Sequence, residues 1–463
     1  MMRGLTLLPL LAAGTILSAC DMAPHYVRPA SAAPSQWPEG ASYTASRSTD
    51  VAGLPWRSLI GDARLQTVIE RALANNRDLR AAIANVASAR AQYHVQRSAQ
   101  LPTIAAGASA TIQRGIKTDA LDANSYSANA GMSSFEIDLF GRLKNETRAA
   151  FETYLSTESG MRSTRLTIVA ETATAYATLA SDRDLLKVAQ DTEASGQRSL
   201  ELTQSLFRSG LTNAGDVQNA ITVVEQAKSD VENFTTAVAQ DRNALELLVG
   251  APVEDALLPA SLSELDHNIA AVPAGLPSTV LLQRPDVLEA EHHLKSANAG
   301  IGAARAAFFP TITLTSAVGV ASSALSSLFT GGALNWSVAP SASVPVLGGA
   351  TRGNLQYAKA QRDYYLALYD KAVQQAFKDV ADGLARRGTI TRQREAQARL
   401  VTAAAKAYSL ADAQYRAGTD SFLNALIAQR TLYASRQTEI GAALTDIDNR
   451  ITLYQAIGAD SSL

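Results

Sequence analysis

The stretch that decides the fold runs from Gly349 to Gly418 and reads GATRGNLQYAKAQRDYYLALYDKAVQQAFKDVADGLARRGTITRQREAQARLVTAAAKAYSLADAQYRAG. It contains no proline and is rich in Ala, Leu, Gln, Arg and Lys, which favour helix. At 1.5 Å per residue, one helix of this length would span about 100 Å, several times the average in globular proteins. A similar stretch runs from Gly141 to Gly210. The sequence therefore predicts two unusually long helices.

Much of the rest of the chain is duplicated with the same offset of 208 residues. The matching residues fall at the ends of the expected elements, where glycine and proline have backbone reasons to occur. We therefore expect a tandem repeat over residues 61–250 and 286–463, in which each copy runs helix, strand, strand, long helix, helix. The matches include Pro102 with Pro310, Gly141 with Gly349, Gly210 with Gly418 and Gly250 with Gly458.

The shorter helices of each copy are predicted to pair with the long one. In the first copy they cover residues 62–100, with Asp62 as N-cap, and residues 216–249. Stacked end to end, they would match the roughly 100 Å of the long helix. Apolar residues recur every seven positions, as in a coiled coil; an ordinary amphipathic core helix is the alternative. The two series are Val217, Val224, Val231, Val238 and Leu245, and Leu426, Tyr433, Ile440, Ile447 and Tyr454.

Two segments change to the alternating pattern of strands, residues 103–140 and 311–347. The alternation slips before Phe135, which predicts a β-bulge. No charged residue occurs from Ala306 to Thr351, and strands of about 10 residues have the length of a tilted membrane strand. Four strands cannot close a membrane barrel, whereas three chains would supply twelve. The alternative is a small soluble sheet packed on helices.

The N-terminal segment has the features of a secreted lipoprotein. An apolar run from Leu5 to Ala19 predicts a signal peptide over residues 1–19. The run ends in Leu17-Ser18-Ala19-Cys20, which resembles the bacterial lipoprotein cleavage box, so we expect Cys20 to be acylated. A plain signal peptide with a chance cysteine is the alternative. Asp21 follows, and in some bacteria an Asp there retains lipoproteins at the inner membrane.

Two proline-containing segments are predicted to be irregular, an extended arm over residues 20–60 and a linker between the copies over residues 251–285. Charge is balanced, with 41 Lys and Arg against 43 Asp and Glu, so nothing points to nucleic acid. His292 and His293 lack a third well-spaced ligand beside Glu289 and Glu291, so we expect a solvated helix face and no metal site. We expect neither an enzyme nor a cofactor, apart from the covalent lipid on Cys20.

Several motifs carry a family resemblance over nearly the whole mature chain. They are FEIDLFGR at Phe135–Arg142, QRPDV at Gln283–Val287, VPVLGG at Val344–Gly349 and YRAG at Tyr415–Gly418. The chain resembles the TolC-like outer membrane efflux proteins, in particular the NodT-like lipoprotein branch of RND-type tripartite systems. The resemblance implies a mainly α-helical homotrimer, with a 12-strand β-barrel in the outer membrane and a 12-helix α-barrel in the periplasm. It also implies a passive duct for small molecules that docks on a periplasmic adaptor and an inner-membrane RND-type pump.

The resemblance places the two turns between long and short helices at the periplasmic tip. Arg208, Gly210, Arg416 and Gly418 would then form the docking surface for the adaptor, although the glycines are also expected as helix C-caps. Relatives close the tip with acidic or bulky residues, and some carry an acidic residue where this chain has Asn424. We expect Leu423 to form an apolar constriction. Asp216 would add carboxylates, or serve as an N-cap.

Two other functions stay open at this point. A duct for protein secretion or metal-ion efflux would have the same architecture. A periplasmic coiled-coil adaptor or scaffold lipoprotein would also use heptads and a lipid anchor. An adaptor has no use for two strand hairpins with a long uncharged stretch, so the strands favour the duct.

Overall fold

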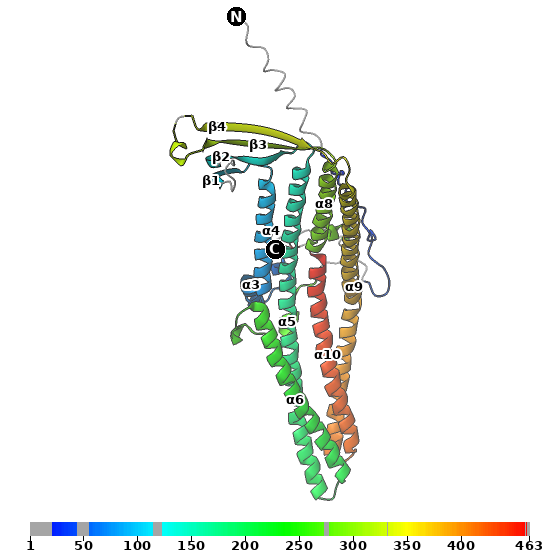
Figure 1. Ribbon diagram of the computed structural model, residues 1–463. Coiled ribbons are helices and arrows are strands. Elements are labelled where there is room, and N and C mark those ends of the chain that lie inside the picture. The colour runs from blue at the N-terminus through cyan, green and yellow to red at the C-terminus, as the bar shows by residue number, and fades with distance from the viewer. Residues whose placement is uncertain are drawn as a thin grey trace. The chain divides into compact units, whose positions relative to one another are not determined.

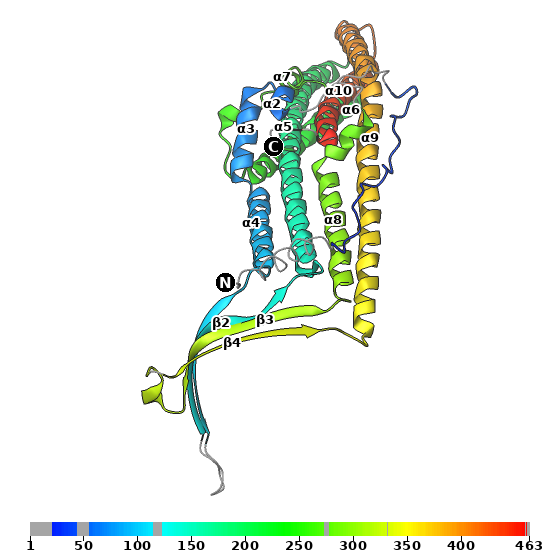
Figure 2. The same cartoon turned by 90° about the horizontal axis from the view of Figure 1, so that it is seen from above.

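The computed structural model describes residues 21–43, 55–113, 123–272, 277–330, 332–458 and 460. Helices dominate, and one four-stranded sheet accompanies them (Figures 1 and 2). The chain divides into two compact units, each drawn from both copies of the repeat. The first unit holds residues up to Ala30, Asn85–Glu158 and Glu289–Asp370. The second holds Ser31–Ala84, Ser159–Leu288 and Lys371–Leu463.

The order of elements confirms the predicted repeat of helix, strand, strand, long helix and helix. The first copy comprises α2 (Trp56–Leu59), α3 (Ala63–Asn75), α4 (Arg77–Ser98), β1 (Ile104–Gln113), β2 (Ala123–Ile137), α5 (Arg142–Arg208) and α6 (Ala214–Val249). The linker holds η1 (Asp255–Leu257), α7 (Leu262–Asp266) and η2 (Ser278–Gln283). The second copy comprises α8 (Pro285–Ala306), β3 (Thr311–Ser322), η3 (Leu325–Ser327), β4 (Leu334–Ser343), α9 (Gly349–Arg416) and α10 (Phe422–Ile457).

The two long helices form as predicted, with 67 residues in α5 and 68 in α9. In the second unit, α5 buries a stripe of small side chains, so that neighbouring elements can approach its backbone closely. Tyr176 lies within this stripe and is fully buried. The small residues of the stripe are Ala170, Ala173, Ala177 and Ala180.

The predicted first helix is wrong in one respect, because it is divided in two at Asn76. Asp62 caps α3 as expected, and its carboxylate accepts the backbone N–H groups of Arg64 and Leu65. The side chain of Asn76 then caps α4 by accepting the N–H groups of Asp78 and Leu79 at 2.9 and 3.0 Å. No proline or glycine marks this break, so the helix-forming residues on both sides of it predicted one continuous helix.

The sheet is antiparallel with the strand order β1-β2-β3-β4. Residues that are paired across strands share a face, and each strand alternates between the two faces. One face is apolar on all four strands and the other carries small polar side chains. The apolar face includes Ile104, Ala106, Ala108, Tyr126, Ala130, Met132, Val318, Val320, Leu334, Trp336 and Val338. The polar face includes Ser109, Ser127, Asn129, Thr313, Thr315, Asn335, Ser337 and Ser341.

The predicted bulge is confirmed, since the register of β2 against β3 shifts between Met132 and Phe135. Ser134 adopts a positive φ of 51°, and its N–H donates to Oγ1 of Thr315 at 3.1 Å. The bulge corrects the slip in the sequence, so Phe135 and Ile137 stay on the apolar face. The second strand segment was predicted to reach residue 347, but β4 ends at Ser343, two residues before Pro345.

Within the first unit, the helices follow the same order as the strands. The parts of α4, α5, α8 and α9 in this unit lie side by side in that order in both views (Figures 1 and 2). Side chains join neighbours in the row: Gln96 bonds to Glu146, the hydroxyl of Ser296 donates to the carbonyl of Ala149, and His293 stacks on Tyr365. Both the sheet and the row of helices therefore have two free edges, β1 and α4 on one side and β4 and α9 on the other. No further strand pairs with β1 or β4 in the part of the chain that the structure describes.

Candidate functional site: the two helix turns

The turns after α5 and α9 have the same backbone structure in both copies. Gly210 and Gly418 have φ angles of 74° and 75°, in the left-handed region that favours glycine. In the first turn the N–H of Gly210 donates to the carbonyl of Phe207 at 3.0 Å, and the next N–H reaches Leu206 at 2.9 Å. Gly418 and Thr419 make the equivalent bonds to Tyr415 and Gln414. This pattern is a Schellman motif, so the prediction of glycine C-caps is confirmed.

One apolar cluster within the second unit holds the four helix ends at the turns together. α5 and α6 contribute Leu200, Val223 and Val224, while α9 and α10 contribute Tyr415 and Phe422. The hydroxyls of Tyr415 and Thr203 hydrogen-bond at 2.9 Å, and burial raises the pKa of Tyr415. Because the cluster draws on both copies, the two turns rest on a shared core and not on separate hairpins.

The contact between α6 and α10 joins equivalent positions of the two copies. Arg430 donates from Nη2 to Oγ1 of Thr222 at 3.0 Å, and these two positions are 208 residues apart. Tyr433 on α10 also donates to Asp230 on α6 at 2.8 Å. The pairing of the copies at this end is thus polar at its surface and apolar inside.

The two predicted docking arginines differ in their surroundings. Arg416 forms an ion pair with Asp412, one helical turn earlier, at 2.8 Å. Arg208 is exposed and has no ion-pair partner among the residues that the structure describes. Phe207 and Leu211 flank Arg208 and are 47% and 74% exposed, so the first turn carries an uncovered apolar rim beside a free positive charge.

The interpretation of Asp216 as an N-cap is wrong. Asn213 caps α6, and its side chain accepts the N–H of Asp216 at 3.0 Å. The carboxylate of Asp216 in turn accepts hydrogen bonds from Thr212 and Asn213 at 2.5 and 3.1 Å. Asp216 therefore lies in the first helical turn, where a negative charge complements the helix dipole. Asn213 three positions before an acidic residue was the signal that could have identified the cap.

Leu423 and Asn424 lie on the exposed side of the first turn of α10. Leu423 is 52% exposed, and Ile427 on the next turn is 54% exposed. The amide of Asn424 donates to both carboxylate oxygens of Asp420, at 2.8 and 3.0 Å. Asp420 was not identified from the sequence, and it places an acidic group beside Leu423 on the second turn. Whether Leu423 constricts a pore depends on the assembly and stays a prediction.

The remaining predicted features have mixed outcomes. Cys20 lies outside the described residues. The expectation of a solvated face around His292 is wrong: its Nδ1 is 2.7 Å from Oε2 of Glu152, and Glu291 is buried in an ion pair with Arg28. Among the described residues, no cluster of three or more His, Cys, Asp or Glu is arranged to hold a metal ion. None of the described helices is both long enough and apolar enough to cross a membrane.

The fold and the turns define a duplicated protein, in which each copy supplies a helical hairpin and half of one sheet. The family model of outer membrane efflux proteins matches residues 68–251 and 276–459, two segments whose starts and ends are both 208 residues apart. The chain belongs to the outer membrane efflux protein family.

Similar proteins agree with this assignment along the whole chain. The antibiotic efflux pump outer membrane protein ArpC and the toluene efflux pump outer membrane protein TtgC, both of Pseudomonas putida, are 42% identical to it. Each match covers 98% of this chain and 95% of the relative. The crystal structure of the open state of the Neisseria gonorrhoeae MtrE outer membrane channel is similar with a TM-score of 0.86 and 34% identity, covering 95% of this chain and 98% of MtrE.

Proposed function

We propose that this protein is the outer-membrane duct of a tripartite efflux pump, in which three copies close one barrel. The observation that carries the proposal is the sheet. Its apolar face is exposed, with Ile104 at 77% and Trp336 at 75%. The outer edges of β1 and β4 have no strand partner among the described residues. Lipid would cover this face, and neighbouring copies would satisfy the edges, because unpaired backbone groups are costly in a membrane.

The free edges also favour a ring of copies. The edge formed by β1 and α4 differs from the edge formed by β4 and α9, so a contact between copies joins unlike surfaces. Contacts between unlike surfaces generate closed rings when the rotation closes. Three copies would give twelve strands, with the polar face lining the lumen. This arrangement supports a passive duct and not an enzyme.

The cargo and partners follow from the relatives. ArpC and TtgC are named for antibiotic and toluene efflux pumps. We infer that this protein carries small molecules of this kind, supplied by an inner-membrane RND-type pump through a periplasmic adaptor. The adaptor would dock on the two turns, at Arg208, Gly210, Arg416 and Gly418. Metal-ion efflux and protein secretion are the outcomes that a cargo assay would have to exclude.

A lipid on Cys20 would anchor the mature chain at the outer membrane, as the lipoprotein-like cleavage box predicts. Metabolic labelling with an alkyne palmitate analogue tests this in the native host. The wild-type protein should carry label and Cys20→Ser should carry none. Equal labelling of both proteins would contradict acylation at Cys20.

The assembly is tested by extraction and by conduction. The membrane protein should require detergent, migrate as a trimer that dissociates only on heating, and conduct ions in a planar bilayer. A Cys20→Ser protein that is freely soluble and monomeric would contradict the barrel and favour an adaptor or scaffold.

Docking at the turns is tested by charge reversal. Arg208→Glu should reduce efflux of a dye or drug in cells that carry the whole pump, because an exposed, unpaired cation would meet the adaptor. Arg399→Glu is the matched control. Arg399 on α9 is 73% exposed, and its contact with Glu395 is long, at 3.9 Å. Equal loss of efflux in both variants would contradict a specific role of the turn in docking the adaptor.

The predicted constriction is tested at Leu423. Leu423→Ala should raise single-channel conductance, because a shorter side chain would widen an apolar ring formed by three copies. Leu410→Ala is the matched control, since Leu410 on α9 is 51% exposed. Unchanged conductance of Leu423→Ala would exclude a gate at this residue, leaving Asp216 and Asn424 as candidates.

A further inference from the structure

The linker between the copies is bound on both of its sides. Toward the first copy, three linker carboxylates form separate ion pairs: Glu254 with Arg71, Asp255 with Arg242 and Glu264 with Arg64. The hydroxyl of Tyr176 also donates to the carbonyl of Leu257 at 2.8 Å. The N–H of Leu262 donates to the carboxylate of Asp184 at 2.9 Å. Tyr176 and Asp184 both belong to α5, so this half of the linker is fixed to the first long helix.

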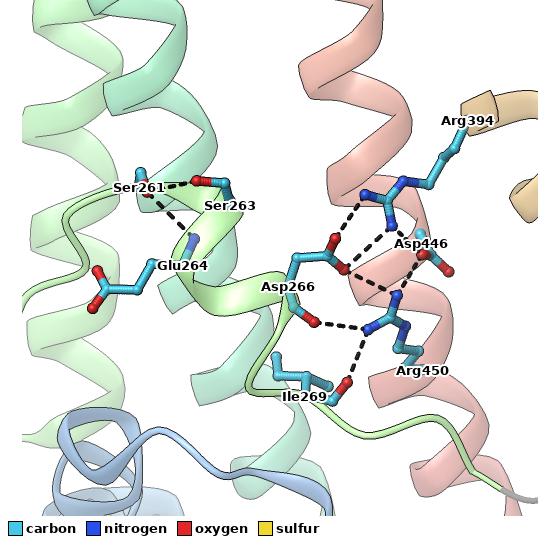
Figure 3. A network of polar contacts seen from close by, with 8 residues as sticks. All are labelled: Ser261, Ser263, Glu264, Asp266, Ile269, Arg394, Asp446 and Arg450. Carbon is cyan, nitrogen blue, oxygen red and sulfur yellow. Dashed lines mark hydrogen bonds and ion pairs between the residues drawn. The ribbon is translucent and has the colours of Figure 1, made fainter. Parts of the chain in front are cut away.

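Toward the second copy, the linker is held by a closed ring of four charges (Figure 3). Asp266, at the end of α7, pairs with Arg394 of α9 at 2.6 Å and with Arg450 of α10 at 2.9 Å. Asp446 of α10 pairs with the same two guanidinium groups, at 2.5 and 2.6 Å. Positive and negative groups therefore alternate around the ring, and their side chains are only 12% to 30% exposed.

The ring also holds the linker backbone. Arg450 donates from Nη1 to the carbonyl oxygens of Asp266 and Ile269, at 3.0 and 2.8 Å. Burial disfavours the charge of Asp266, but hydrogen bonding and the nearby guanidinium charges outweigh it and lower the pKa of this carboxyl. Asp266 is therefore charged at neutral pH, and the linker cannot leave α10 without breaking both ionic and backbone contacts.

The duplication does not account for this ring. The positions 208 residues earlier than Asp266, Arg394 and Asp446 are Ser58, Leu186 and Val238, none of which is charged. Only Arg450 has a charged counterpart, Arg242, which pairs instead with Glu246 and Asp255. The first copy thus holds the linker by separate ion pairs, whereas the second copy holds it by a closed ring of charges.

We propose that the ring of Asp266, Arg394, Asp446 and Arg450 is a latch, which fixes the linker to the α9–α10 pair and keeps the duct narrow until it is broken. The four groups depend on one another. Removal of Asp266 would leave two guanidinium groups to share one carboxylate, so the linker at α7 would lose its ionic contacts with both helices at once. Hydrogen bonds to linker carbonyls, from Arg387 of α9 and Arg450 of α10, would still hold it there. The α5 side would stay attached. The effect on the duct rests on the proposed function, whereas the attachment itself does not.

Hydrogen exchange of the detergent-purified full chain tests the attachment directly. In Asp266→Asn, the amides of Asn268 and Ala270, which donate to the carbonyls of Leu265 and Leu59, should exchange at least tenfold faster than in the wild type. Asp255→Asn is the matched control, because Asp255 lies in the same linker, is 83% exposed and pairs with Arg242. It should leave these amides unchanged. Equal exchange in all three proteins would overturn the latch.

A milder variant covers the case that Asp266→Asn does not fold. Arg394→Lys keeps the charge but loses the two-pronged contact with Asp266, so it should accelerate the same amides by a smaller factor. If Arg394→Lys exchanges like the wild type, the latch is likewise overturned.

Conductance in a planar bilayer tests the consequence for the duct. Asp266→Asn should conduct at least threefold more than the wild type, and Asp255→Asn should match the wild type. Equal currents in all three proteins would show that the latch does not control the duct. Absence of any current from the wild type would instead contradict the proposed function, and hydrogen exchange would still decide the attachment.

Discussion

At each helix turn, one glycine adopts a left-handed backbone conformation that other residues avoid. The glycine is needed for this conformation and not for close packing. Gly210 and Gly418 have positive φ angles. Apart from the adjacent residues in the chain, no heavy atom of the described residues lies within 4 Å of the position that a Cβ would occupy. A side chain at either position would therefore cost backbone strain without a steric clash.

This difference predicts opposite effects of alanine at two glycines. Gly418→Ala should destabilise the protein by about 1 kcal/mol, because alanine must adopt a positive φ. Gly441→Ala should stabilise it by roughly 0.5–1 kcal/mol, because Gly441 lies inside α10 with open space around it. Midpoints of thermal unfolding would measure both. A stabilising Gly418→Ala would contradict the left-handed conformation of the turn.

Asp448 of α10 is a carboxyl that the structure accommodates poorly. It lines a groove of about 500 Å³ with Asp379, Asp382 and Arg386. Its Oδ1 is buried and has no hydrogen-bond partner among the described residues. Burial raises its pKa from 3.8 to about 6. The folded protein therefore binds this proton more tightly than the unfolded chain, and stability falls as pH rises from about 4 to about 6.

Asp448→Asn should remove this pH-dependent cost. At pH 7.5 we expect a gain of about 1 kcal/mol, less than the full pKa shift implies because solvent reaches part of the group. Near pH 4 the gain should vanish, because the wild-type carboxyl is then protonated. Asp382→Asn, which loses only an exposed pair with Lys378, should show no such pH dependence. Thermal unfolding at the two pH values decides between these outcomes.

At the scale of single residues, sequence reasoning succeeded where the backbone sets the residue type. The turn glycines were predicted because a left-handed C-cap requires them. The surroundings of His292 and the partner of Asp216 were not, because they depend on which helix lies opposite and on competition between neighbouring caps. The ion pairs of Asp266 were not predicted for the same reason, since its partners are more than 100 residues away along the chain.

At the scale of elements, the break between α3 and α4 shows how a side chain can divide a helical pattern. Asn76 caps α4 and also donates its amide to the carbonyl of Leu248 at 2.9 Å, which ties the break to the end of α6. The break therefore has a tertiary partner that the local sequence does not reveal.

Replacement of Asn76 tests the two roles separately. Asn76→Ala should cost about 1–2 kcal/mol, since it removes a cap and leaves the carbonyl of Leu248 without this donor. Asn76→Ser keeps an oxygen that can cap α4 and loses the amide donor without adding a buried charge, so it should cost less. Chemical unfolding compares them. Equal stability of Asn76→Ala and the wild type would mean that the cap contributes nothing.

In the strands, by contrast, the alternation of apolar and small polar residues was sufficient to predict the elements and their two faces. The slip before Phe135 predicted a bulge, and the register shift between Met132 and Phe135 confirms it. A one-residue change of phase would otherwise turn Phe135 and Ile137 to the polar face.

At the scale of the whole molecule, the duplication could be predicted from the sequence because its two copies align without gaps. The two segments matched by the family model have the same offset. Assembly is a different matter. Free sheet edges and an uncovered apolar face are the basis of the proposed assembly, but the number of copies comes from the family resemblance and not from the strands themselves. The proposed barrel requires that lipid cover the apolar face of the sheet.

Fluorescence quenching by lipids with brominated acyl chains shows whether lipid covers this face. Trp336 is one of three tryptophans and is 75% exposed on the apolar face. With Trp37 and Trp56 replaced by Phe, its emission should be strongly quenched in brominated vesicles and little affected by iodide in water. A tryptophan at position 337 instead (Trp336→Phe, Ser337→Trp) would lie on the polar face and should show the reverse. If Trp336 is quenched by iodide and not by brominated lipid, the apolar face of the sheet does not face lipid and the barrel is contradicted.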